Sequence, residues 1–101
     1  MILGRVVGTV VATQKDEGLQ GYKLLLVQAV DMDMKPKAAY QVAVDAVGAG
    51  EGELVITVSG SSARLTKRTE GKPVDVAIIA VVDSVDAGGK RAFSKFEKAG
   101  G

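Results

Sequence analysis

The sequence contains no cysteine and no histidine. Without cysteine the chain forms no disulfide, no zinc–thiolate centre and no thiol nucleophile. Without histidine it also lacks the commonest general base and the commonest metal ligand. These absences remove the usual equipment of catalysis. We therefore expect a protein that is not an enzyme and that holds neither a metal nor another cofactor.

The charges are nearly balanced, and the apolar runs are short. The 13 basic and 12 acidic residues give a formal net charge of +1, which provides no general attraction to nucleic acid or to acidic lipid. The longest uninterrupted apolar run, 76–82, is far shorter than the roughly 18 residues that a membrane-spanning helix needs. Met1 leads straight into an alternating pattern that carries Arg5, so we expect no secretory leader. We expect one small cytoplasmic domain that binds neither membrane nor nucleic acid.

Residues typical of β-strands are abundant. Val, Ile, Leu, Tyr and Thr dominate five stretches that turn residues separate, and these are residues 3–13, 22–31, 39–46, 53–59 and 74–83. No stretch has a sustained apolar period of 3.6 residues, and the one short helical segment that we expect lies within 62–67. The pattern predicts a mostly β protein, a small five-stranded barrel or sandwich.

Several of these strands are apolar on both faces. In the second strand, Leu24 and Leu26 lie on the face opposite to Leu25. A strand of a solitary antiparallel barrel is normally apolar only on its inner face, and monomers avoid leaving a large apolar patch in water. We therefore expect neighbouring subunits to cover the second face; a terminal segment is the alternative. Val7, Leu25 and Ile79 are candidates for burial between subunits, although the pattern does not assign which face points inward.

The segment GSSAR at 60–64 interrupts the strand-like sequence. A serine nucleophile needs an activating base, and the composition offers no histidine to supply one. We interpret Ser61 or Ser62 as a cap that accepts hydrogen bonds from the backbone amides of the following turn.

The C-terminal part of the chain has a different composition. We place the end of the domain at residue 85 and treat 86–101 as a tail, because Gly88 and Gly89 break the strand pattern and the remainder is basic. Phe93 and Phe96 are three residues apart. Two interpretations stay open: a short amphipathic turn over 90–98 that docks weakly, or a flexible, frayed end.

The strand segments also occur in a familiar order. The stretches LGRVVGTVVAT, KLLLVQ and VAVDAVGAGEGELV are followed by GSSAR and KPVDVAIIAVVDSV. Together, over residues 1–85, they resemble the vertex proteins of bacterial microcompartments, the EutN/CcmL family. The resemblance implies an OB-like barrel of five strands with one short helix between strands 4 and 5. It also implies a homopentamer at the fivefold vertices of an icosahedral shell, with hexameric and trimeric shell proteins as its partners.

The same resemblance places GSSAR near the fivefold axis. Ser61, Ser62 and Arg64 of five copies would then line a narrow pore suited to a small anion. Alternatively, Arg64 pairs with Asp45 or Asp83 of a neighbouring subunit and serves assembly.

A second function remains open at this point. Barrels of the OB type are also typical of proteins that bind single-stranded nucleic acid through aromatic residues on their strands. Tyr22 and Tyr40 are the only aromatic residues on the predicted strands. We keep this binding module as the alternative to a structural shell protein.

Overall fold

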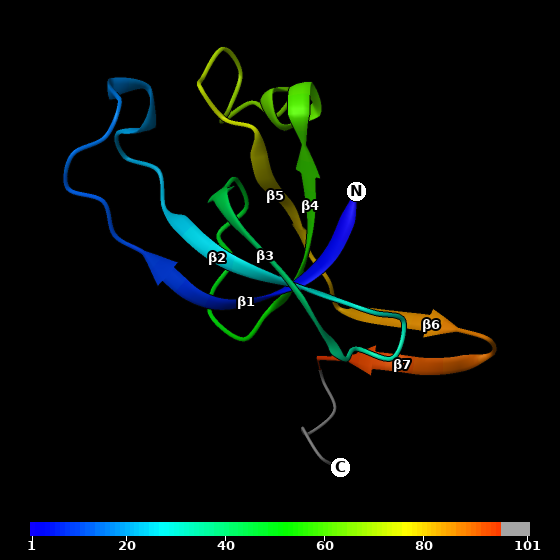
Figure 1. The fold of residues 1–101 in the computed structure, drawn as a ribbon. Helices are drawn as coiled ribbons and strands as arrows, with labels where there is room; N and C mark the ends of the chain where they lie inside the picture. The colour runs from blue at the N-terminus through cyan, green and yellow to red at the C-terminus, as the bar shows by residue number, and fades with distance from the viewer. Residues whose placement is uncertain (96–101) are drawn as a thin grey trace.

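The computed structural model describes residues 1–95 of the chain, and the strands within them form a closed barrel and a separate two-stranded sheet (Figure 1). The barrel strands are β1 (Ile2–Val10), β2 (Leu24–Val30), β3 (Pro36–Asp45), β4 (Leu54–Ser59) and β5 (Val76–Val81). The small sheet pairs β6 (Ser84–Ala87) with β7 (Lys90–Ser94). Two 3₁₀ turns complete the described elements, η1 (Glu17–Leu19) and η2 (Gly60–Arg64). Within these residues no helix has the length or the hydropathy to cross a membrane.

The barrel strands follow the order β1-β2-β3-β5-β4, and β4 pairs with β1 to close the barrel. The β3–β5 pair is parallel, and the other four pairs are antiparallel. Each of the five predicted strands overlaps one observed strand, and η2 lies between β4 and β5. The predicted five-stranded OB-like barrel with a short helix at that position is therefore confirmed.

The interior of the barrel is filled by aliphatic side chains from every strand. Its buried members are Val6, Leu25, Val27, Ala43, Ala49, Val55 and Ile78. The structure thus assigns the inward face that the two-sided apolar pattern left undecided. Leu25 is 1% exposed in the single chain, so its side chain has no surface left for a neighbouring subunit.

A β-bulge at Val7 changes which face β1 presents. Val6 is paired with Val27, but Gly8 is paired with Leu26, so Val7 has no partner in the register. An extra residue of this kind shifts the alternation along the strand. Strict alternation would put Val6 and Val10 on one face, whereas the bulge sends Val10 to the outer face.

Part of the second apolar face is covered by the chain itself. A second cluster, outside the barrel interior, contains Val44, Val58, Ala63, Val74 and Ala77, with Leu19, Tyr22, Leu24 and Ile79 packed against it. These residues come from η1, η2 and the segment 65–75 as well as from the strands. Our expectation that neighbouring subunits cover this face is therefore corrected for this part, because local segments of the same chain shield it.

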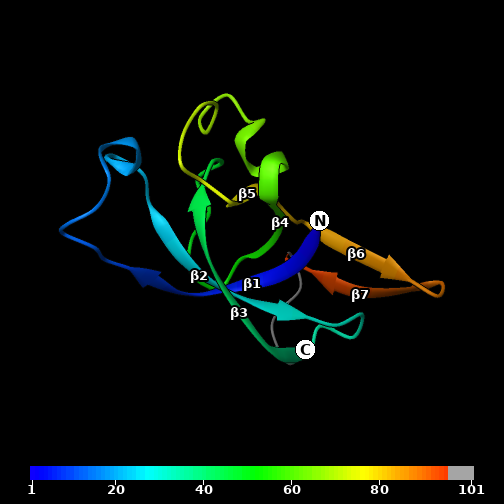
Figure 2. The ribbon, with the colours of Figure 1, turned by 45° about the horizontal axis from the view of Figure 1, so that its top comes forward.

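The β6–β7 hairpin projects away from the barrel (Figures 1 and 2). Gly88 and Gly89 form its turn with φ angles of 59° and 77°, the conformation that a two-residue hairpin turn requires. Residues 90–94 are therefore strand, and the amphipathic turn considered for this stretch is wrong there. Phe96, on which that interpretation also depended, lies outside the described residues.

Candidate assembly surfaces and the GSSAR turn

The GSSAR segment forms η2 at one end of the barrel. Gly60 has a φ angle of 64°, which lets the chain turn sharply out of β4, and its amide donates to the Asp75 carbonyl at 2.8 Å. The N-cap position is occupied by Ser59, whose side chain makes no capping hydrogen bond. Ser61 and Ser62 lie inside the turn and are exposed. The interpretation of Ser61 or Ser62 as the cap is therefore wrong.

A buried threonine stabilises this region instead. The Thr69 hydroxyl donates to the Ala63 carbonyl at 2.6 Å, and it lies 2.6 Å from the Thr66 hydroxyl. The Thr66 hydroxyl in turn accepts from the Thr69 amide at 3.0 Å. Thr69 is fully buried, so these bonds form away from water. Sequence analysis missed Thr69, because its role depends on contacts that only the fold brings together.

The three predicted pore residues lie together on η2. Ser61, Ser62 and Arg64 are all exposed, and Leu65 beside them is 81% exposed. Arg64 Nη1 donates to the Val74 carbonyl of the same chain at 3.1 Å, which holds the arginine against its own barrel. Their place near a fivefold axis and the bound anion both stay predictions.

The two carboxylates considered as partners of Arg64 differ in availability. Asp45 is buried, and its Oδ1 accepts from the amides of Val47, Gly48 and Ala49 at 3.0, 3.0 and 3.1 Å. Its Oδ2 lies 3.6 Å from Lys23 Nζ. Asp45 thus organises a loop of its own chain and has little capacity for a partner. Asp83 is exposed and forms an ion pair with Lys95 at 3.2 Å.

An uncovered apolar surface lies on the outside of β1, β2 and β3. Gly8, Leu26 and Val42 occupy one cross-strand row, with Val7 and Tyr40 nearby on the same strands. Val42 is 49% exposed and Tyr40 is 58% exposed. We call this set the outer β1–β3 face. Val7, a predicted interface residue, lies at this face, whereas sequence analysis did not name Val42.

A second apolar surface lies beside η2. It is a shallow cleft lined by Met1, Val58, Ser59, Ser62, Leu65, Thr66 and Ile79. Ile79, the third predicted interface residue, is half-buried in this cleft. We call this surface the η2 cleft. One chain therefore presents two different apolar surfaces.

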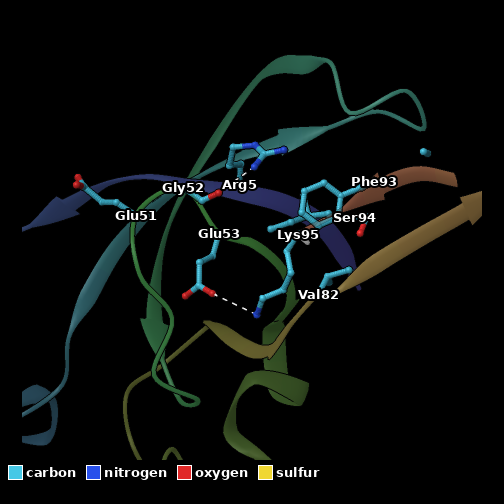
Figure 3. Close-up of a pocket in the computed structure, with 10 residues that line it drawn as sticks. Arg5, Glu51, Gly52, Glu53, Val82, Phe93, Ser94 and Lys95 are labelled. Atoms are coloured by element: carbon cyan, nitrogen blue, oxygen red, sulfur yellow. Dashed lines mark hydrogen bonds and ion pairs between the residues drawn. The ribbon is translucent and has the colours of Figure 1, made fainter. Parts of the chain in front are cut away.

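A groove separates the barrel from the hairpin (Figure 3). It is lined by Arg5, Leu54, Val82, Phe93 and Lys95 among other residues. The Arg5 guanidinium donates to the Gly52 carbonyl at 2.9 Å and lies 5.5 Å from the centre of the Phe93 ring. Lys95 Nζ pairs with Asp83 at 3.2 Å and approaches Glu53 to 3.9 Å. These contacts link the base of the hairpin to the barrel.

The aromatic residues do not form a stacking platform for nucleic acid. Tyr22 precedes β2, and its hydroxyl donates to the Arg68 carbonyl. Tyr40 is the single aromatic residue on the described barrel strands. Single-strand binders stack successive bases on several such rings, so the described strands do not favour that alternative.

Comparison with known proteins gives consistent matches over almost the whole chain. The family described as "Ethanolamine utilisation protein EutN/carboxysome" matches residues 1–83. The shell vertex protein EutN of Salmonella typhimurium is 47% identical over 95 residues, covering 94% of this chain and 96% of that protein. The structure of CcmL from Gloeobacter violaceus superposes with a TM-score of 0.91 at 41% identity, covering 96% of this chain and all of that one. The structure of GrpN from Rhodospirillum rubrum, described as a pentameric microcompartment shell protein, superposes with a TM-score of 0.78 at 46% identity, covering 86% of this chain and all of that one.

The barrel and these matches define a structural protein of a polyhedral shell rather than an enzyme. The chain belongs to the EutN/CcmL family of bacterial microcompartment shell vertex proteins. Its place is accordingly the shell of a microcompartment or carboxysome.

Proposed function

We propose that this chain forms a homopentamer that closes the fivefold vertices of a microcompartment shell. The observation that carries the proposal is the presence of two different uncovered apolar surfaces, the outer β1–β3 face and the η2 cleft. A cyclic ring joins one surface of each copy to a different surface of the next, whereas a twofold dimer uses the same surface twice. The pentameric description of the relative GrpN supports a ring of five.

The surrounding partners follow from the geometry of a closed shell. Sixfold tiles extend as flat layers, so an icosahedral shell needs a fivefold unit at each corner. We propose hexameric and trimeric shell proteins as the tiles that contact the rim of this pentamer. The subunit then acts by holding one angle between neighbours, which a rigid barrel does better than a flexible loop.

The GSSAR turn would line the centre of the ring. Its exposed Ser61, Ser62 and Arg64 lie beside the η2 cleft, one of the two surfaces expected to meet a neighbour. We infer that five copies of these side chains surround the axis and present hydroxyl and guanidinium donors to a small anion. A crystal grown in sulfate tests this inference: an anion on the axis within hydrogen-bond reach of Ser61 or Ser62 supports it, and a GSSAR turn on the outer rim contradicts it.

Native mass spectrometry of the purified chain tests the oligomeric state directly. We expect a dominant species of five copies at micromolar concentration, and a dominant monomer or dimer would contradict the proposal. Co-expression with hexameric shell proteins tests the role in the shell. Closed polyhedra should form with the chain, and shells with open corners or elongated forms should appear without it.

A further inference from the structure

The β6–β7 hairpin is attached to the barrel at its base but makes few contacts with the barrel strands along its length. A two-stranded hairpin alone is only marginally stable in water. The hairpin begins at Ser84, and the match to CcmL of Gloeobacter violaceus, which covers 96% of this chain, includes most of it. It is therefore a projecting element of the subunit with exposed surface on the single chain. We call the segment 84–94 the arm.

The arm lies at one end of an elongated subunit. The chain extends 44 Å along its longest axis and 24 Å along each of the other two. The connection between β1 and β2, residues 11–23, projects at the opposite end from the arm in both views (Figures 1 and 2). A head-to-tail ring joins two different surfaces of the chain, and these two protrusions allow each copy to offer a different end to each neighbour.

The two ends carry complementary groups. The arm presents Lys90 beside its turn, and within the described residues Lys90 forms no ion pair, whereas Arg91 pairs with Asp86 at 2.5 Å. The β1–β2 connection presents Asp16 and Glu17, neither of which forms an ion pair in that same part of the chain.

The β1–β2 connection also exposes an apolar residue. Val11, at its start, is 84% exposed. Opposite charges steer the approach of two surfaces, and burying an exposed aliphatic residue adds to their affinity. Both effects favour contact between this connection and the arm of a second copy.

We propose that the arm of each copy binds the β1–β2 connection of the next copy in the ring, with Lys90 facing Asp16 and Glu17. This inference rests on the proposed pentamer. It adds a specific contact between neighbouring subunits, through which each copy recognises another copy of the same chain. The Arg5–Phe93 contact has a positioning role here, because it links the base of the arm to β1.

Charge reversal provides the first test. Lys90→Glu and Glu17→Lys should each weaken the ring severalfold at low salt, as seen in the protein concentration at which native mass spectra lose the pentamer. The double variant should recover most of the loss, because it restores opposite charges across the contact. Lys72→Glu is the matched control, since Lys72 is exposed and unpaired within residues 1–95 but belongs to neither end. Circular dichroism establishes that each variant is folded.

The absence of natural cysteine permits a second test. The double variant Glu17→Cys, Lys90→Cys, treated with a short bis-maleimide, should give a covalent ladder of up to five copies on a denaturing gel. Each single-cysteine variant should give no species beyond two copies. Suppose that the wild-type chain is pentameric, the double-cysteine variant gives no ladder and neither charge reversal weakens the pentamer. This result would overturn the arm contact and leave the proposed function intact. A wild-type chain that is not pentameric would overturn both.

Discussion

Gly4 lies against Val27 inside the barrel so closely that a Cβ atom on Gly4 would be 2.5 Å from Val27 Cγ1. It would also be 3.0 Å from the Gln28 carbonyl oxygen. Real Cβ atoms do not approach other heavy atoms to such a distance without displacement of a neighbour. The absence of a side chain at Gly4 therefore lets β1 and β2 pack at their observed separation.

Substitution of Gly4 by alanine should destabilise the barrel. We expect Gly4→Ala to lower the free energy of unfolding by about 1–3 kcal/mol, the usual cost of overpacking a core. Gly50→Ala is the control, because a Cβ there would meet only the Glu53 carboxylate, at 3.6 Å, and Gly50 belongs to neither proposed interface. Its effect should stay below about 1 kcal/mol. Urea unfolding at one fixed protein concentration measures both; equal effects would contradict the packing argument.

Loss of the Asp45 carboxylate should destabilise the loop that follows β3. Asp45→Ala leaves three backbone amides without their acceptor and leaves Lys23 without its ion pair. Hydrogen bonds to a charged group are worth about 1.5–3 kcal/mol, so we expect a total loss on the order of 3 kcal/mol in thermal or urea unfolding. Asp45→Asn keeps an acceptor oxygen and should lose clearly less. If the two variants unfold alike, the amide contacts are not what makes this residue important.

The turn after β4 should depend on Thr69 and not on the serines. Thr69→Val removes the buried hydroxyl that bonds to Ala63 and Thr66, and we expect a loss of about 1–3 kcal/mol. Ser61→Ala and Ser62→Ala should each change the stability by no more than about 0.5 kcal/mol, as surface substitutions usually do. A larger loss in either serine variant would indicate a capping bond that the structure does not contain.

A charge on the outer β1–β3 face should prevent assembly without unfolding the subunit. Val42 is half-exposed, so Val42→Asp is compatible with the folded barrel. In the ring the new carboxylate would be buried without a partner, which is costly. We expect a folded monomer by analytical ultracentrifugation and circular dichroism. Lys72→Asp, on an exposed segment away from this face, should remain pentameric, and a pentameric Val42→Asp would place the interface elsewhere.

The sequence identified the barrel strands because each is a short run rich in Val, Ile and Leu between turn residues. It did not identify the inward face, since Leu25 and Leu26 are equally apolar and only the bulge at Val7 fixes how β1 faces β2. For that reason Val7 and Leu25 were both named as candidates for burial between subunits. Leu25 is instead buried inside the barrel, and burial of Val7 between subunits stays a prediction.

The hairpin was missed even though its turn was visible in the sequence. Gly88–Gly89 is a two-residue turn signal, but the flanking residues lack the aliphatic alternation of the barrel strands and were therefore interpreted as a tail. The roles of Asp45 and Thr69 depend on atoms brought together by the fold. No local pattern distinguishes a carboxylate that binds its own loop from one that is free to meet another subunit.

The seam between β3 and β5 has a consequence for how the subunit opens. It consists of two residue pairs, Val44 with Ala77 and Asp45 with Ile78, and it is the parallel closure between segments separated by β4 and η2. It is the shortest of the five barrel ladders, so the fewest cross-strand contacts hold it together. Regions with few contacts open at the lowest free energy, and the barrel should therefore open first at this seam. The Ala46 amide, which donates to the Ile78 carbonyl at 3.3 Å, should exchange with solvent sooner than the amides of the longer β1–β2 ladder, so that the subunit opens along one defined line.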